Sequence, residues 1–468
     1  MGVEASNVEA SRATSARSIS KGLLSYSAVF LIPLALRLIP ELQHSYPLGV
    51  DTPGYMYVIQ YGRLAGGYAQ TNIFYNLLVL LGRTGVSAME FFKAYPAVTF
   101  ALTAFLIAIY LKRGMGWSLR SLVIFSIAYS FVPALLRTSL DLQRQSFAVS
   151  LLALALVLTT FRWDWRTKAL ALSAVYVLIG LTHELVFAIA VAIQLWTVAK
   201  ALAKGRLRRD DALPPLIVAV SVVAYAVIRP QFVLPFLRSL FVSGYQPLGV
   251  SLASGWERFD WWASMGLLSY GFVLPLAAMG RFYDDRLVPW LIASIVPYAS
   301  FAVSYVSFNL PDRWLYLAAV PISVYAANFL RRFTLRELSL YALLAIVAIQ
   351  PMSMLGAMPL PLSVYAEKRY GTFADLMSTS VPEGQIRALQ LYSERANRSS
   401  AGLLILVVPY ELAPWATYFF PDDRVVPSDS PVLNSSSTTV VYVSYEGSAP
   451  QGFEMKFSYA GLSFYGRG

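Results

Sequence analysis

"GLLSYSAVFLIPLALRLIPEL" (residues 22–42) is followed, after Gln43, by "HSYPLGVDTPGYMY" (residues 44–57), and these two stretches decide the kind of fold the chain adopts. The first is an apolar run long enough to cross a hydrocarbon core of about 30 Å. It is too long for a cleaved signal and has no clear small-residue cleavage site, so we interpret it as a retained membrane anchor. The second is a Pro- and Gly-rich turn that places a carboxylate, Asp51, directly after the anchor.

Composition identifies the chain as a polytopic membrane protein. Of its 468 residues, 57% are hydrophobic and only 13% are charged, far from the balance of a soluble domain. The chain has no cysteine and two histidines, which excludes a disulfide framework, a thiolate metal site and His-rich metal binding. The net charge of +11 arises from short Lys and Arg clusters between apolar runs, so we assign the clusters to topology and expect no nucleic-acid partner.

The apolar runs and basic clusters together predict the topology. We expect an α-helical polytopic membrane protein with about eleven transmembrane helices, with the N-terminus cytoplasmic and the C-terminus external at the cell membrane. A shorter run, 72–81, is predicted as an interfacial helix on the outer side. The predicted spans are 22–42, 91–111, 119–136, 145–161, 169–182, 185–199, 212–229, 264–280, 287–307, 314–330 and 338–357.

The run from Ala169 to Ala199 could be one tilted helix or a tight hairpin. Both of its flanks are strongly basic, and the positive-inside rule places both in the cytoplasm. A hairpin therefore follows, with "THELV" (182–186) at its outer turn. A single helix would instead bring His183 and Glu184 near the midplane and would favour a proton-coupled transporter.

Three domains are predicted. Residues 1–21 form a cytoplasmic tail, residues 22–358 a transmembrane domain whose first external loop is 43–71, and residues 359–468 a small external α/β domain. In the last of these, 383–398 has the pattern of an amphipathic helix. The segments 402–409, 438–446 and 453–465 have the pattern of strands, and the glycosylation sequons at Asn397 and Asn434 also lie in this domain.

Asp51 has two interpretations. "DTPGYMY" has the form of a helix start, with Asp or Thr as the cap and Pro in the first turn. The same carboxylate is also expected at the membrane–water interface, beside lipid head groups, where it could act as a reactive group. Local chemistry alone does not separate these readings.

Other ionisable residues gather in the predicted external segments. In "LLRTSLDLQRQS" (135–146), Arg137, Asp141 and Arg144 have helical spacings of four and three, so we expect one helical face to carry all three. Asp141 could form a local ion pair with one of the two arginines. The other arginine would then be available to bind a phosphate group. Arg313, at the outer mouth of the tenth span, is either an interfacial anchor or a phosphate ligand.

Four stretches together resemble the GT-C superfamily of integral-membrane glycosyltransferases. They are "GVDTPGY" (49–55), "LDLQRQSFAVSLLALAL" (140–156), "GLTHELVFAIAV" (180–191) and "PDRWLYLAAVPISVYAA" (311–327). The resemblance implies a transferase that takes a sugar from a polyprenyl-phosphate or polyprenyl-pyrophosphate donor at the outer leaflet. It also implies that Asp51 matches the catalytic acid of the first external loop, and that Arg313, Arg144 and Arg137 are the candidates to hold the donor phosphate.

One departure narrows the resemblance. The oligosaccharyltransferase branch carries a Trp-Trp-Asp-Tyr-Gly motif in its external domain, and nothing in 359–468 matches it. Transfer of whole glycans to Asn sequons is therefore disfavoured. The layouts of protein mannosyltransferases and of lipid A aminoarabinose transferases both stay open.

The expected mechanism needs one base and one anion clamp. Asp51 would deprotonate or orient the acceptor, which is a lipid, a glycan or a protein, while the arginines stabilise the lipid-phosphate leaving group. His183, Glu184 and Asp141 could orient the acceptor. Alternatively, Asp51, Asp141 and Glu184, with His183, could bind one divalent cation such as Mg²⁺ or Mn²⁺. The rival functions are a polymerase of lipid-linked oligosaccharides, a transporter and a non-catalytic membrane scaffold.

Overall fold

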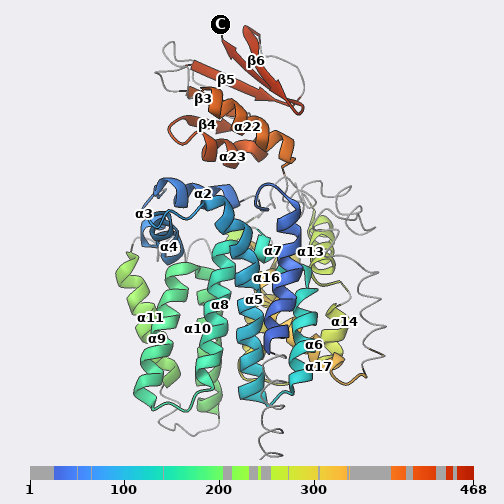
Figure 1. The fold of residues 1–468 in the computed structure, drawn as a ribbon. Coiled ribbons are helices and arrows are strands. Elements are labelled where there is room, and N and C mark those ends of the chain that lie inside the picture. The colour runs from blue at the N-terminus through green and yellow to red at the C-terminus, as the bar shows by residue number, and fades with distance from the viewer. Residues whose placement is uncertain are drawn as a thin grey trace, which may run out of the picture. The chain divides into compact units, whose positions relative to one another are not determined.

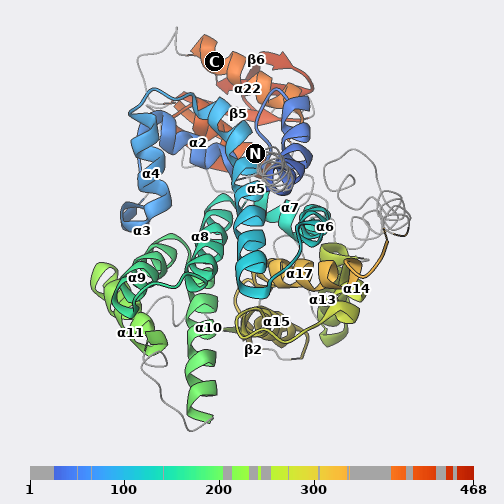
Figure 2. The same ribbon diagram turned by 60° about the horizontal axis from the view of Figure 1, so that its bottom comes forward.

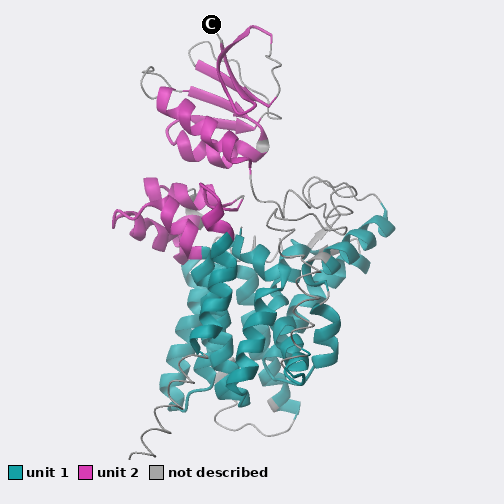
Figure 3. Cartoon of the chain, turned by 45° about the vertical axis from the view of Figure 1, so that its right-hand side comes forward, with its two compact units in different colours: residues 1–39, 96–377 teal, residues 40–95, 378–468 magenta. Residues whose placement is uncertain are grey.

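The computed structural model of the protein describes fourteen segments, which form two compact units. The units are 1–39 with 96–377, and 40–95 with 378–468 (Figure 3). The predicted tail 1–21, the span 338–357, Asp141 and both sequons lie outside the described residues. The described residues are 26–49, 51–64, 66–140, 142–203, 213–230, 241–243, 254–271, 273–303, 306–334, 337, 381–396, 404–427, 439–445 and 451–467.

The first unit is almost entirely helical, as the apolar runs predict. A helix over Tyr26–Gln43 begins in this unit, and α5 (Ala88–Met115) ends in it. By length and composition these two helices could cross a membrane, and a third span results if α6 and α7 are taken as one. The count of about eleven spans stays a prediction. The other helices are α6 (Leu119–Ser130), α7 (Pro133–Leu140), α8 (Gln143–Thr159), α9 (Trp165–Thr182), α10 (Glu184–Ala203), α11 (Leu213–Ile228), α13 (Gly255–Tyr270), α14 (Val273–Gly280), α15 (Leu287–Val303), α16 (Pro311–Leu317) and α17 (Ala319–Leu330), with a short antiparallel pair β1 (Phe241–Ser243) and β2 (Val306–Phe308).

The prediction of two helices over 169–199 is confirmed. Helix α9 ends at Thr182, and His183 has the extended backbone angles φ −154° and ψ 117°, so α10 begins anew at Glu184. Figures 1 and 2 show α8, α9, α10 and α11 side by side. Both ionisable residues of "THELV" therefore lie at a helix junction.

Short polar signals start several of these helices. The Asp164 carboxylate accepts hydrogen bonds from the backbone N–H groups of Arg166 and Thr167 at 3.0 and 3.1 Å, which caps α9. Ser254 and Glu257 form a reciprocal capping box at the start of α13. Such caps satisfy N–H groups that a helix leaves without partners.

Three predicted spans are each built from two helices. Helices α6 and α7 meet at 66°, α13 and α14 are separated at Gly271, and α16 gives way to α17 at Ala318. Irregular backbone inside a membrane protein must find hydrogen bonds from its neighbours. Trp290 Nε1 accordingly donates to the carbonyl of Leu317 at 2.8 Å, and the Tyr270 hydroxyl donates to that of Leu315. The break between α16 and α17 is therefore stabilised by two buried side chains, Trp290 and Tyr270.

The second unit contains the predicted α/β module. Its five-stranded sheet has the order β4-β3-β5-β7-β6, in which β4, β3 and β5 are parallel and β7 and β6 run antiparallel to their neighbours. The strand predictions over 402–409 and 438–446 are confirmed, and 453–465 forms a hairpin; the sequence reading missed β4. The elements are α22 (Glu383–Ala396), β3 (Leu404–Val408), α23 (Ala413–Phe419), β4 (Arg424–Pro427), β5 (Thr439–Ser444), β6 (Phe453–Tyr459) and β7 (Leu462–Arg467).

The first external loop belongs to this second unit. It contains α2 (Thr52–Tyr61) and α3 (Gly66–Thr71), and α4 (Ile73–Gly82), which follows the loop in the same unit, confirms a short helix over 72–81. The Tyr61 hydroxyl donates to the Tyr418 carbonyl at 3.0 Å, and the Tyr46 hydroxyl donates to Gln390 Oε1 at 2.7 Å. These bonds join segments more than 300 residues apart, so loop and C-terminal module pack as one body.

Candidate active site

The motif "NLPDRW" (309–314) sets up one edge of the site. Leu310 has φ 52° and ψ 58°, a left-handed conformation that is uncommon for a residue with a side chain. Asn309 supports it, because its Oδ1 accepts from Leu310 N at 2.9 Å and its carbonyl accepts from Trp314 Nε1 at 3.1 Å. Pro311 then starts α16, so Asp312 and Arg313 occupy its first turn.

The charges of two arginines, Arg144 and Arg313, act on His183. Its side chain is buried, with 3% exposed, and its Nδ1 has no hydrogen-bond partner among the described residues. Burial lowers the pKa of His183 well below its usual value, and the charges of Arg144 and Arg313 lower it further. The structure therefore brings these three predicted site residues together, from the α9–α10 junction, the start of α8 and the start of α16, and His183 is neutral near pH 7.

Arg137 and Asp312 extend this cluster. Arg137 is buried on α7, and its charge acts on the Asp312 carboxyl and on Tyr316, one turn further along α16. Burial raises the pKa of Asp312, and Arg313 and Arg137 lower it in part. The cluster thus contains Arg137, Arg144, Arg313, His183 and Asp312, which we call the arginine cluster.

The expectation of one helical face through Arg137, Asp141 and Arg144 is wrong. Helix α7 ends at Leu140 and α8 begins at Gln143, with Leu142 at φ −90° and ψ 51° between them. The i, i+4 and i+7 spacing assumed a helix that continues outward, whereas the chain turns back here to begin the next span. Arg137 and Arg144 therefore reach the arginine cluster from two different helices.

Glu184 has a structural partner that the sequence did not indicate. Arg229, which follows α11 and is fully buried, donates from Nη1 to Glu184 Oε1 at 3.0 Å and from Nη2 to the Leu181 carbonyl at 2.7 Å. The bonds tie α11 to the α9–α10 junction. Arg229 lies 45 residues from Glu184 in the chain, so no local spacing could have paired them.

The described residues do not assemble the divalent-cation site suggested by the sequence. No group of three or more His, Cys, Asp or Glu among them lies close enough together to hold a metal ion. Glu184 is paired with Arg229, and Asp51 belongs to the second unit.

Two glutamines beside Arg144 were also missed. Gln143 and Gln145 are both buried; the Oε1 of each, and the Nε2 of Gln145, have no hydrogen-bond partner in the described part of the chain. Gln145 lines a cavity of about 10 Å³ together with Tyr316 and Thr138, a space for about one water molecule. Polar residues at the start of an apolar run, as in "LQRQS", are the signal that could have marked them.

Asp51 lies in the second unit, at the position preceding α2. It is exposed, and its side chain makes no capping hydrogen bond, although its carbonyl accepts from Gly54 N at 3.1 Å. The preceding chain is held by Glu41, whose buried carboxylate accepts from Leu48 N at 3.0 Å. The backbone thus positions Asp51, while its carboxylate is not used to cap the helix.

The architecture of the chain is similar to that of solved membrane proteins, although its sequence is not. No family model matches the chain, and no curated protein matches it significantly in sequence. Structures of ArnT from Cupriavidus metallidurans, with undecaprenyl phosphate bound and in the apo state, align with TM-scores of 0.58 at 13% and 11% identity, over 96% of this chain and 98% of theirs. An apo oligosaccharyltransferase from Archaeoglobus fulgidus aligns with a TM-score of 0.51 at 15% identity, over 87% of this chain and 64% of its own. The chain therefore shares the fold of ArnT and of the archaeal oligosaccharyltransferase.

Proposed function

We propose that the protein transfers a sugar from a polyprenyl-phosphate or polyprenyl-pyrophosphate donor to an acceptor hydroxyl at the outer face of the cell membrane. The observation that carries the proposal is the convergence of Arg144 and Arg313 on His183, with Arg137 beside Asp312. The shared GT-C fold supports it, as does the undecaprenyl phosphate bound to ArnT. The N-terminus is cytoplasmic and residues 359–468 are external in this proposal.

The arginines would hold the donor phosphate. Guanidinium groups form charge-assisted, often bidentate hydrogen bonds to phosphate oxygens. Three arginines meet here with Asp312, and Asp141 is the only other acid in the motifs that supply them, so positive charge is in excess. In a site shielded from water such charges stabilise a leaving phosphate more strongly than they do in bulk solvent.

Asp51 would act on the acceptor. In a single displacement, the acceptor oxygen forms a bond to the anomeric carbon as the bond from that carbon to the phosphate oxygen breaks. Asp51 accepts the proton of the acceptor hydroxyl, and the lipid phosphate leaves with the electron pair of the broken bond. The anomeric centre is inverted in such a step.

His183 would orient a substrate hydroxyl. Its neutral ring and its Nδ1, which has no hydrogen-bond partner among the described residues, support that role. Glu184, paired with Arg229, would act as a positioning residue for His183 next to it, and Asp141 remains a candidate of the same kind.

The test is sugar transfer by the full chain in membrane vesicles. Radiolabelled polyprenyl-phosphate hexoses and pentoses are supplied as donors, and Asp51→Asn is compared with the wild type. Loss of a general base predicts a decrease of about 10²- to 10⁴-fold. Asp422→Asn removes another exposed carboxylate of the second unit, one paired with Arg63, and should leave transfer unchanged.

Full activity of Asp51→Asn would exclude the catalytic role. The length of the product separates the two enzymatic readings, because a polymerase of lipid-linked oligosaccharides yields a ladder of chains. A single added sugar supports the transferase.

A further inference from the structure

A second polar cavity lies in the first unit, at the other end of α9 from His183. It has a volume of about 470 Å³ and opens between the end of α8, the α8–α9 loop and helices α9, α10 and α11. The cavity lining reaches along α9 as far as Leu172, and the helix rises about 16 Å from there to His183, which is about half of a hydrocarbon core of about 30 Å. The cavity is distinct from the arginine cluster.

Its lining is basic. Arg162, Lys168 and Arg286 face it, and none of its thirteen described lining residues is acidic. Lys168 is held in place, because its Nζ donates to the carbonyl of Thr159 at 2.9 Å and to that of Phe161 at 3.4 Å. Arg162 and Lys168 lie close together in the chain, around the start of α9, whereas Arg286 lies more than 100 residues further on, so the fold brings the third cation to the first two.

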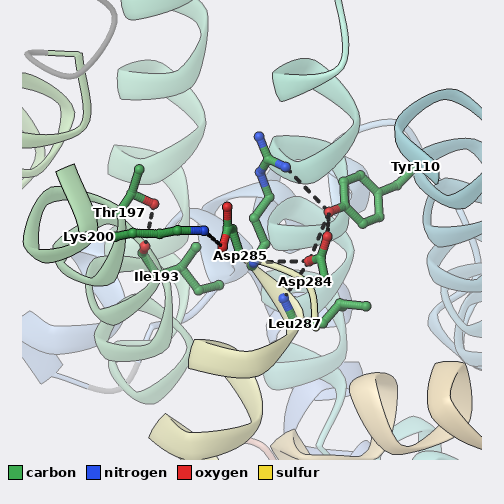
Figure 4. Close-up of polar contacts among 8 residues, drawn as sticks. Tyr110, Ile193, Thr197, Lys200, Asp284, Asp285 and Leu287 are labelled. Atoms are coloured by element: carbon green, nitrogen blue, oxygen red, sulfur yellow. Dashed lines mark hydrogen bonds and ion pairs between the residues drawn. The ribbon is translucent and has the colours of Figure 1, made fainter. Parts of the chain in front are cut away.

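The carboxylates nearest in sequence to these cations have hydrogen-bond partners of their own. Asp284 accepts from the Tyr110 hydroxyl at 3.1 Å, and Asp285 pairs with Lys200, as Figure 4 shows. Asp164 caps the first turn of α9. Each of these acids therefore has another hydrogen-bond partner, although Arg286 also donates from Nη1 to the Tyr110 hydroxyl at 3.5 Å and its charge acts on Asp285. Among the described lining residues, no carboxylate accompanies the three cations.

Aromatic and apolar groups complete the lining. Trp163 and Trp165 are 40% and 50% exposed at its rim, and Leu172, Ile193 and Ile217 line its interior. Tryptophan is enriched where hydrocarbon meets head groups. The cavity thus combines cations at head-group depth with an apolar wall, on the side where the basic clusters predict the cytoplasm.

We infer that this cavity binds the phosphate head group of an anionic phospholipid of the cytoplasmic leaflet. Basic pockets between transmembrane helices on that side are suited to such head groups. Arg162 and Arg286 would bind the phosphate oxygens, and the apolar wall would contact the first carbons of the acyl chains. The inference does not depend on the proposed sugar transfer.

Native mass spectrometry of the detergent-purified full chain tests this. The protein is titrated with phosphatidylglycerol, with phosphatidylcholine, and with inorganic phosphate as a competitor. We expect phosphatidylglycerol to bind at least tenfold more tightly than phosphatidylcholine. In Arg162→Gln/Arg286→Gln its affinity should fall about 25-fold, which is about fivefold for each cation removed.

Two further variants make the result decisive. Arg281→Gln/Arg332→Gln removes two exposed arginines near the same ends of the helices but outside the cavity, and should keep wild-type affinity. Thr197→Trp fills the cavity without changing its charge and should also abolish selective binding, which decides the matter if the arginine variant fails to fold. Equal affinity of the wild type for phosphatidylglycerol and phosphatidylcholine overturns the inference. Phosphatidylglycerol binding that is unchanged in both Arg162→Gln/Arg286→Gln and Thr197→Trp overturns it as well. Displacement of the lipid by millimolar phosphate would instead assign the site to a free anion.

Discussion

Arg229 donates a hydrogen bond to Glu184 at 3.0 Å, with the two side chains 0% and 15% exposed. The pair closes the junction at which His183 leaves α9 and Glu184 starts α10. It therefore ties the position of His183 in the arginine cluster to the end of α11. A buried pair of this kind responds very differently to loss of one partner and to loss of both.

Arg229→Leu should destabilise the protein by about 3–5 kcal/mol, because it leaves the Glu184 charge without its buried partner. The double variant Glu184→Leu/Arg229→Leu should recover most of this loss, since no charge is then stranded. Thermal unfolding in detergent, read as a double-mutant cycle, measures both effects. Additive losses would mean that the two residues act independently.

Arg313→Lys should reduce kcat/KM for the lipid-linked donor by about 10- to 100-fold, although the charge is kept. A lysine ammonium cannot reproduce the planar two-point contact of a guanidinium with phosphate. Arg281→Lys, an exchange at an exposed arginine away from the cluster, is the matched control. Equal kinetics in the two variants would remove Arg313 from the phosphate site.

Stability should fall on acidification because of His183. Its pKa in the folded protein is lowered by burial and by Arg144 and Arg313, so the unfolded chain binds the proton first as pH falls. Below the unfolded value of about 6.5, each pH unit should cost up to about 1.4 kcal/mol until the folded pKa is reached. The contribution is fully present above that range.

His183→Asn should flatten the pH dependence of thermal unfolding between about pH 6.5 and the folded pKa. His44 is the only other histidine and lies in the second unit, so His44→Gln should retain the slope. If the pH dependence survives in His183→Asn but disappears in His44→Gln, it arises from His44 and the prediction is wrong.

Gly280→Ala should prevent stable folding or lower the melting temperature severely. A Cβ at this position would lie 1.9 Å from the Tyr325 carbonyl oxygen and 2.7 Å from Phe329 N, so α14 and α17 would have to separate. At Gly266 in α13 the nearest atom to an added Cβ is the Tyr298 hydroxyl at 3.4 Å. Gly266→Ala should therefore be neutral or slightly stabilising, and similar losses in the two variants would contradict the packing described.

Several elements could be predicted because their signals are local. The two helices over 169–199 follow from basic flanks on an apolar run, and the starts of α9 and α13 follow from Asp164 and from Ser254 with Glu257. The strands β3 and β5 follow from short apolar runs. The helical spacing of Arg137 and Arg144 gave a wrong prediction of a single helical face, because periodicity does not reveal that a helix ends at Leu140.

The sequence by itself determined the membrane class, the positions of the apolar runs and of most strands, and the ionisable residues that lie near helix ends. It could do so because hydropathy, charge bias and capping act within a few residues of the chain. Only the tertiary structure decided that Arg144 and Arg313 meet at His183 and that Glu184 pairs with Arg229. Such meetings depend on the rotation and register of packed helices. Rotation and register are fixed by close contacts, such as that of Gly280 with the Tyr325 carbonyl. Such contacts form between residues that are far apart in the chain, so no local pattern reveals them.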